Sequence, residues 1–224
     1  MPIDYTKKPR EQAPAATAPP AATPGKVTLT KSAPTVSLTK STGGGGVLRV
    51  NLNWTSRPSG GFLRKREPDV DLDLGCLYEF TGGRKGVVQA LGNAFSVTAP
   101  GAASPTIWLD GDDRSGSNSA GENLHVDLGQ AAAISRVLVF AYIYKGSANW
   151  AGADGLVTLT PASGPSIEVH LDEPRDGART CAIALLTPTG GDLAVRREVR
   201  YVDGTQAQLD AAYDWGIRWG VGRK

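Results

Sequence analysis

From residue 27 onward, most of the chain alternates between apolar and polar residues with the two-residue period of β-strands. Residues 47–54 and 124–128 alternate in this way, as expected of strands that bury one face. Residues 136–144 form a continuous apolar run instead, which is typical of a central strand buried on both faces. Turns rich in glycine and proline separate the segments. The pattern predicts an all-β protein, a β-sandwich of mainly antiparallel strands. Further strands are predicted at residues 69–80, 87–91, 106–109, 156–159, 167–171, 180–186 and 193–202.

Two similar segments stand at the start of this region. Residues 27–31 read Val-Thr-Leu-Thr-Lys and residues 36–40 read Val-Ser-Leu-Thr-Lys. Apolar residues alternate with hydroxyl residues in both segments, and Ala33-Pro34 separates them. The repeat predicts either two edge strands or one hairpin.

A helical period appears near the end of the chain. Thr205 and Gln208 fit a capping box, in which each side chain accepts a hydrogen bond from the other residue's backbone. The predicted apolar face of the helix consists of Leu209, Ala212, Tyr213 and Ile217. We therefore expect a C-terminal helix that packs on the core. Trp215 and Trp219 leave a second interpretation open, a surface for a partner protein.

The first 26 residues differ from the rest in composition. They are rich in alanine and proline and contain no large apolar residue after Tyr5. Such a segment buries too little apolar surface to offset the entropy lost on ordering. We therefore predict a disordered tail at residues 1–26 and one β-sandwich domain at residues 27–224.

Charge and cysteine content limit the functional classes. The chain has 24 Lys and Arg residues against 22 Asp and Glu residues, and a net charge of +2 gives no general attraction to nucleic acid or anionic membranes. No apolar run reaches the roughly 18 residues of a membrane span, and the N-terminus lacks the apolar core of a signal peptide. Cys76 and Cys181 cannot form a disulfide framework, although a single disulfide stays open. We expect a reduced, cytoplasmic protein without direct membrane insertion.

The first of two acidic stretches is Asp69-Val70-Asp71-Leu72-Asp73. In an extended backbone the three carboxylates share one face, and the apolar residues share the other. Calcium is the usual partner of such a row of carboxylates, because it takes six to eight oxygen ligands in flexible geometry. Residues 69–80 do not fit an EF-hand loop, since Leu74 stands where glycine is required and Phe80 where glutamate is required. A solvated acidic edge is the alternative.

The second acidic stretch lies about forty residues later. Asp110, Asp112 and Asp113 stand among glycine and serine residues, and Glu122 follows. We predict one or two calcium sites that the two stretches build together. The main ligands would be Asp71, Asp73, Asp112 and Asp113, with Asp69, Asp110 and Glu122 in support.

These motifs resemble the TerD family of tellurium-resistance and stress proteins, and most closely its TerA branch. The segments that carry the resemblance are residues 36–40, 69–73, 111–116, 122–128, 139–144 and 197–202. The resemblance covers about residues 27–224. Two segments depart from the family pattern. Gly75 replaces a serine that many members carry, and residues 117–122 hold fewer acidic residues, so one of the family's two calcium positions would be weak or lost.

The resemblance implies a non-enzymatic, calcium-binding protein of the cytoplasm that is associated with tellurite resistance. It implies a scaffold or sensor role beside other tellurium-resistance proteins, including a membrane-embedded one.

Three alternatives stay open. An enzyme would need a catalytic base or nucleophile, but His125 and His170 occupy ordinary strand positions and Cys76 has no activating charge nearby in the sequence. A calcium-dependent carbohydrate-binding sandwich is the second, because residues 122–129 and 134–137 resemble a strand of discoidin-like lectins. A membrane-docking calcium module is the third, and basic residues 64–66 are its support.

Overall fold

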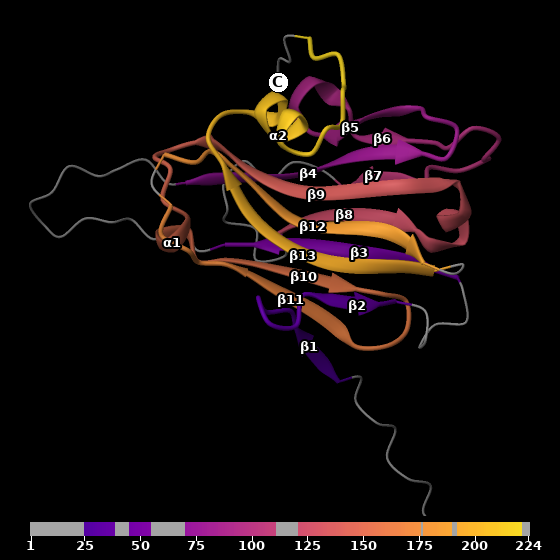
Figure 1. Ribbon diagram of the computed structural model, residues 1–224, viewed down its shortest axis with the longest axis horizontal. Coiled ribbons are helices and arrows are strands. Elements are labelled where there is room, and N and C mark those ends of the chain that lie inside the picture. The colour runs from indigo at the N-terminus through magenta and orange to yellow at the C-terminus, as the bar shows by residue number, and fades with distance from the viewer. Residues whose placement is uncertain are drawn as a thin grey trace, which may run out of the picture.

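The computed structural model describes residues 25–38, 45–54, 70–110, 121–175, 177–189 and 192–220. Within these residues two β-sheets pack face to face (Figure 1). Sheet A contains, in spatial order, β1 (Lys26–Thr28), β11 (Ser166–Leu171), β10 (Gly155–Thr160), β3 (Val47–Asn53), β8 (Glu122–Asp127), β7 (Ile107–Leu109) and β6 (Ser96–Val97). Sheet B contains β2 (Thr35–Ser37), β13 (Asp192–Val202), β12 (Thr180–Thr189), β9 (Ile134–Lys145), β4 (Asp71–Phe80) and β5 (Lys85–Gln89).

The helices within the described residues are short. They are η2 (Leu91–Asn93), η3 (Leu128–Ala133), α1 (Trp150–Ala153) and α2 (Gln206–Ala212). Of these, the sequence pattern predicted α2 alone. In this part of the chain no helix has the length and apolar character needed to cross a lipid bilayer.

The core lies between the two sheets. Leu48, Val50 and Leu52 of β3 belong to the same buried cluster as Leu72 and Leu74 of β4, and all five side chains are fully buried. Every strand pair is antiparallel except β1 with β11. The all-β sandwich of mainly antiparallel strands is therefore confirmed.

Strand β9 crosses the middle of sheet B between β12 and β4. Val139 and Ala141 point into the core between the sheets, while Leu138 and Phe140 belong to a second cluster on the outer side. All four side chains are fully buried. The continuous apolar run at residues 136–144 is thus a strand buried on both faces, as predicted.

The two similar N-terminal segments are edge strands and do not form a hairpin. β1 pairs with β11 at the edge of sheet A, and β2 pairs with β13 at the edge of sheet B. Leu29 and Leu38, one from each segment, are both buried in the core. The repeat therefore bridges the two sheets along one side of the sandwich.

The outer face of sheet B is apolar and carries α2 and the segment that follows it. Leu77, Leu138 and Phe140 of the sheet pack with Leu209 of α2 and with Trp215, which is fully buried. The Trp215 indole N–H donates to the carbonyl of Tyr78 at 3.1 Å. This arrangement confirms the interpretation of the C-terminal helix as a core-packing element, and Figure 1 shows α2 at the same end of the molecule as β5.

The helix is shorter than its apolar period suggests. Its capping box of Thr205 and Gln208 forms as predicted, but α2 ends at Ala212, so Ile217 lies beyond it. The buried carboxylate of Asp210 accepts hydrogen bonds from the backbone N–H groups of Gly216 and Ile217 at 2.7 and 2.8 Å. In a longer helix these two N–H groups would donate to backbone carbonyls. Here they donate to the Asp210 carboxylate instead, and the chain turns back over the sheet.

The outer face of sheet A is polar. Arg49 and Asn51 of β3, Asn123 and His125 of β8 and Thr158 of β10 alternate with core residues and are at least partly exposed. Strands β3, β8 and β10 thus follow the alternating pattern expected of strands with one buried face.

Candidate functional site

The first acidic stretch lies where β4 extends beyond its neighbour β5. The pairing between β4 and β5 ends at Gly75 and Gln89, whereas β4 continues to Asp71 beside β9. Beyond Gly75, the edge of β4 that faced β5 is therefore open to groups from sheet A. The side chain of Glu122 uses this opening, because its Oε2 accepts a hydrogen bond from the N–H of Leu74 at 2.6 Å.

Asp71 and Asp73 are buried at this end of β4. Their exposed fractions are 5% and 0%, although both are carboxylates. Alternation along β4 sends Leu72 and Leu74 into the core and places the two aspartates on the outer face of sheet B, where Asp73 lies opposite Tyr142 of β9. The predicted division into an acidic face and an apolar face is therefore present. The acidic face is not a solvated edge.

Glu122, at the end of the second acidic stretch, contacts the strand that holds the first. It lies at the start of β8, is 4% exposed, and pairs with Leu52 of β3. The preceding Gly121 has φ of +66° and packs so closely on the carbonyl of Leu52 that a Cβ atom would collide with it. Glycine is therefore required for the chain to enter β8 in the position that brings Glu122 to Leu74.

Asp110 stands at the other end of the second stretch and points elsewhere. Its Oδ1 lies 2.8 Å from Nε2 of His125, and its side chain is 53% exposed. His125 in turn stacks on Trp108, with ring centroids 5.0 Å apart and an angle of 14° between the planes. Asp110 is thus held on the outer face of sheet A, away from the face of Asp73.

The remaining predicted ligands, Asp69, Asp112 and Asp113, lie outside the described residues. Within the described ranges no group of three or more His, Cys, Asp or Glu side chains is placed to hold a metal ion. The structure brings together Asp71, Asp73 and the Glu122 contact, which form part of the predicted ligand set. These carboxylates supply oxygen donors, and oxygen is what calcium prefers.

Gly75, which stands where the resemblance implies a serine, is closely packed. A Cβ atom at this position would lie 2.8 Å from Cζ of Phe140 and 2.9 Å from the carbonyl oxygen of Val88. The ring of Phe140 therefore fills the space that a side chain at position 75 would need. Residue 75 therefore offers no side-chain ligand to a calcium site beside Asp73.

Two residues that hold this site were not identified from the sequence. The indole N–H of Trp54 donates to the carbonyl of Val70 at 3.1 Å, which fixes the chain just before Asp71. Asn51 donates to Oδ1 of Asn123 at 3.0 Å beside Glu122. A tryptophan and an asparagine at ordinary strand positions give no signal of such long-range contacts.

The cysteines and His125, which were considered for catalysis, lie in environments that do not activate them. Cys76 and Cys181 are both free and fully buried, and burial raises the pKa of each thiol well above its ordinary value. Neither is therefore a reactive thiolate at neutral pH. His125 is held between Asp110 and Trp108, as described above.

Comparisons with known proteins bear on the family and the fold. No family model matches the chain. Over 203 residues the chain is 41% identical to the tellurium resistance protein TerA of an Alcaligenes species, and this match covers 89% of the chain and 58% of that protein. The chain thus spans less than two thirds of the length of this curated relative.

Two solved structures have a similar fold. One is a homologue of the telluride resistance protein TerD from Streptomyces coelicolor, with 21% identity, a TM-score of 0.54, and coverage of 78% of this chain and 100% of that one. The other is a protein of unknown function, with 17% identity, a TM-score of 0.54, and coverage of 78% and 99%. At these identities the likeness shows the fold alone.

Proposed function

Since the chain belongs to the TerD family of tellurium-resistance proteins and is most similar to its TerA branch, we propose that it is a calcium-binding protein of the tellurite stress response. It acts in the cytoplasm as a scaffold or sensor and has no catalytic activity of its own. Its partners are other tellurium-resistance proteins, including a membrane-embedded one.

One observation supports the calcium site above all. Two carboxylates, Asp71 and Asp73, are buried side by side on one strand face, and Glu122 reaches the same strand from the other sheet. Burying like charges is costly unless opposite charge compensates them. A divalent cation would lower this cost by adding opposite charge, and its binding would join sheet B to the second acidic stretch.

The proposed ligands follow from this placement. Asp71 and Asp73 would hold the ion from β4, and Asp112 and Asp113 would complete the site from the second stretch. Glu122 accepts the Leu74 N–H with Oε2, so its role is to position the two stretches.

The non-enzymatic role is supported by the surroundings of the candidate nucleophiles. Both thiols are buried with a raised pKa, so they are poorly suited to reducing an oxyanion. A sensor needs instead a ligand-dependent change of stability or shape. A site shared by two sequence-distant stretches provides this, because the ion binds the folded arrangement and not the separated stretches.

The test is a calcium titration of the full-length protein by calorimetry. We expect Asp71→Asn and Asp73→Asn each to weaken binding at least about tenfold, because each removes a charge close to the ion while keeping the side-chain shape. Asp214→Asn is the matched control, since Asp214 is exposed and has φ of +49°, a conformation that asparagine also adopts. Unchanged affinity in both strand variants would refute the site.

The partner role has its own test. The full-length protein is mixed with purified tellurium-resistance proteins and crosslinked, with calcium or with a chelator. We expect a complex that forms with calcium and is weakened by Asp73→Asn but not by Asp214→Asn. A turnover activity that is lost through one point substitution would contradict the non-enzymatic assignment.

A further inference from the structure

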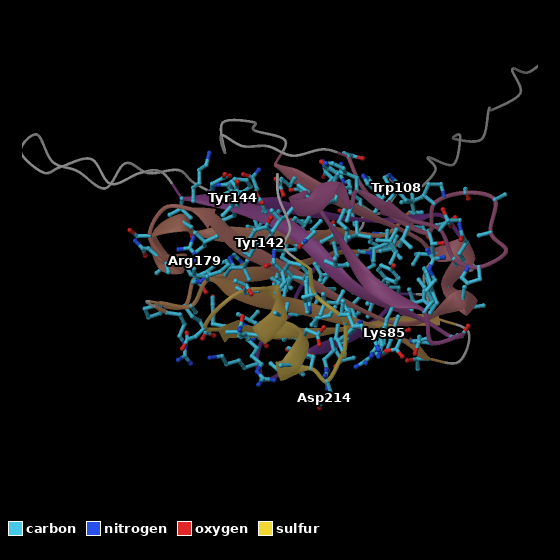
Figure 2. All side chains as sticks on the ribbon, turned by 90° about the horizontal axis from the view of Figure 1, so that it is seen from above. Lys85, Trp108, Tyr142, Tyr144, Arg179 and Asp214 are labelled. Carbon is cyan, nitrogen blue, oxygen red and sulfur yellow. The ribbon has the colours of Figure 1, made fainter. Side chains whose placement is uncertain are left out.

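A hollow of about 390 Å³ lies beside the edge strands β6 and β7 of sheet A. Phe95, Pro105 and Trp108 form an apolar wall, and Ser96, Ser104 and Asp127 supply hydroxyl and carboxylate groups. This volume is within the range of small-molecule sites in proteins. Figure 2 shows Trp108 on the opposite side of the molecule from Asp214, so the hollow is distinct from the face that α2 covers.

The aromatic wall is held in a fixed orientation. His125 stacks on the Trp108 ring, and Asp110 holds His125 through the 2.8 Å contact between Oδ1 and Nε2. A stacked tryptophan loses little rotamer freedom when a ligand binds, so less of the binding free energy is spent on ordering the site.

The polar wall is also fixed before any ligand binds. Gln130 donates from Nε2 to Oδ2 of Asp127 at 2.8 Å and to Oγ of Ser104 at 3.2 Å. Its Oε1 accepts from the hydroxyl of Thr106 at 2.5 Å. One glutamine thus ties Asp127 to Ser104 and sets the spacing of their oxygen atoms.

The charge of the lining indicates the class of ligand. The lining contains one carboxylate and no cationic side chain, so phosphates, sulfates and nucleic acids would be repelled. The carboxylate of Asp127 already accepts from the N–H of Gly129 at 2.9 Å and from Gln130, which partly compensates its charge and makes it a weak site for an organic cation. Hydroxyl groups are neutral donors that can bind the remaining lone pairs of Asp127 and the two serines.

We propose that this hollow binds a neutral saccharide, with an apolar ring face packed on Trp108 and ring hydroxyls hydrogen-bonded to Asp127, Ser96 and Ser104. Sugar rings have such an apolar C–H face beside a rim of hydroxyls, and the hollow presents the complementary surfaces. The carbohydrate-binding alternative that the sequence left open was calcium-dependent, whereas in this hollow Asp127 and the two serines would bind the sugar hydroxyls directly. The saccharide site goes beyond the proposed function and does not depend on calcium binding to Asp71 and Asp73.

The experiment is an NMR titration of the full-length, ¹⁵N-labelled protein with maltotriose, cellotriose and the trimer of N-acetylglucosamine. We expect at least one of these to shift the indole N–H signal of Trp108 and the backbone signals of Ser96, Ser104 and Asp127. Trp108→Ala should weaken the binding at least about tenfold. Trp219→Ala is the matched control, because Trp219 lines a different hollow next to α2, and it should bind as the wild type does.

A second variant keeps the test decisive if Trp108→Ala does not fold. Ser96 is exposed on the two-residue edge strand β6 and lies opposite Trp108, so Ser96→Trp should block the hollow without disturbing the core. Lack of binding by all three sugars, sugar shifts that map to other residues, or unchanged binding in Ser96→Trp would overturn the proposal. Tighter binding of tetramethylammonium than of any sugar would overturn it as well.

Discussion

The outer face of strand β4 is buried at both ends, but the buried side chains are apolar at one end and acidic at the other. At one end Leu77 packs with Phe140 and Trp215 beneath the C-terminal segment. At the other end Asp71 and Asp73 are buried to a similar degree as carboxylates. In Figure 2, Tyr142 marks the side of the acidic end, because Asp73 lies opposite it on β9, and Lys85 marks the side of the apolar end, because it donates to the carbonyl of Trp215.

The two ends are stabilised in different ways. Burial of apolar side chains is favourable by itself, at roughly 25 cal/mol for each Å² removed from water. Burial of carboxylates is favourable only with compensating charge and hydrogen bonds. The apolar end therefore stabilises the fold under all conditions, whereas the proposed calcium site would make the contribution of the acidic end depend on the ion. This difference is what a sensor requires.

The largest expected effect is at the apolar end. Trp215→Ala removes a fully buried side chain, its hydrogen bond to Tyr78 and the guanidinium of Arg136 stacked 3.9 Å from its ring centroid. We expect a loss of about 3–5 kcal/mol in the free energy of unfolding, with or without calcium, measured by urea denaturation. Trp108→Ala on the outer face of sheet A is the control and should cost clearly less. Equal losses of unfolding free energy in the two variants would show that the C-terminal segment contributes no more to stability than the polar face of sheet A does.

At the acidic end the effect should depend on calcium. Calcium at about 100 times its dissociation constant should stabilise the wild type by roughly 2.7 kcal/mol if the unfolded chain does not bind it. Asp73→Asn should lose most of that gain, because it removes one of the charges that would bind the ion while keeping the side-chain shape. Thermal melts with calcium, with magnesium and with a chelator measure this. A variant that calcium still stabilises fully would place the ion elsewhere, and magnesium should substitute poorly.

Asp210 provides a further case, a buried carboxylate whose hydrogen-bond donors all lie in the C-terminal segment. It accepts hydrogen bonds from two backbone amides and from the indole N–H of Trp219 at 2.8 Å. Asp210→Asn places an amide donor against these donors and should cost about 1–3 kcal/mol, independent of calcium. Asp214→Asn in the same segment is the control and should change stability by less than about 0.5 kcal/mol. If the stability lost in Asp210→Asn depended on calcium, the two ends would not be independent, and the account would be contradicted.

A smaller effect is expected from the buried thiols at high pH. Burial raises the pKa of Cys76 in the folded state, so the folded protein retains a proton that the unfolded chain releases above about pH 8.5. Stability should therefore fall as pH rises beyond that point, and Cys76→Ala should make the decline shallower. Melting temperatures between pH 7 and pH 10 test this. An identical decline in the variant would assign the effect to other groups, such as Tyr201, whose pKa is also raised by burial.

Local sequence pattern was sufficient for most of the fold. Residues 47–54 form β3, because their two-residue period corresponds to burial on one face. Residues 136–144 form β9, because a continuous apolar run corresponds to burial on both faces. The capping box at Thr205 was also readable, since its partners are three residues apart. The end of α2 was not, because the side chain that ends it, Asp210, acts through tertiary hydrogen bonds.

The candidate site was predictable only in part. The spacing of Asp71 and Asp73 predicted a shared face, and the structure places them there. The contact of Glu122 with Leu74 depends on where β5 stops and on the close approach of Gly121 to Leu52, and neither follows from local sequence. The role of Asp110 beside His125 likewise depends on the register between β7 and β8. Long-range strand register is the information that a single sequence does not carry.

The most direct test of the calcium site uses terbium, a lanthanide that binds oxygen-rich calcium sites and emits when a nearby indole is excited. Trp54 is 6% exposed and donates a hydrogen bond to Val70, the residue before Asp71, so its indole lies beside the end of β4 where the ion is proposed. We predict sensitised terbium emission in the wild type that calcium displaces, most of which is lost in Trp54→Phe but retained in Trp108→Phe. Emission that persists in Trp54→Phe and disappears in Trp108→Phe would contradict a calcium site at the end of β4.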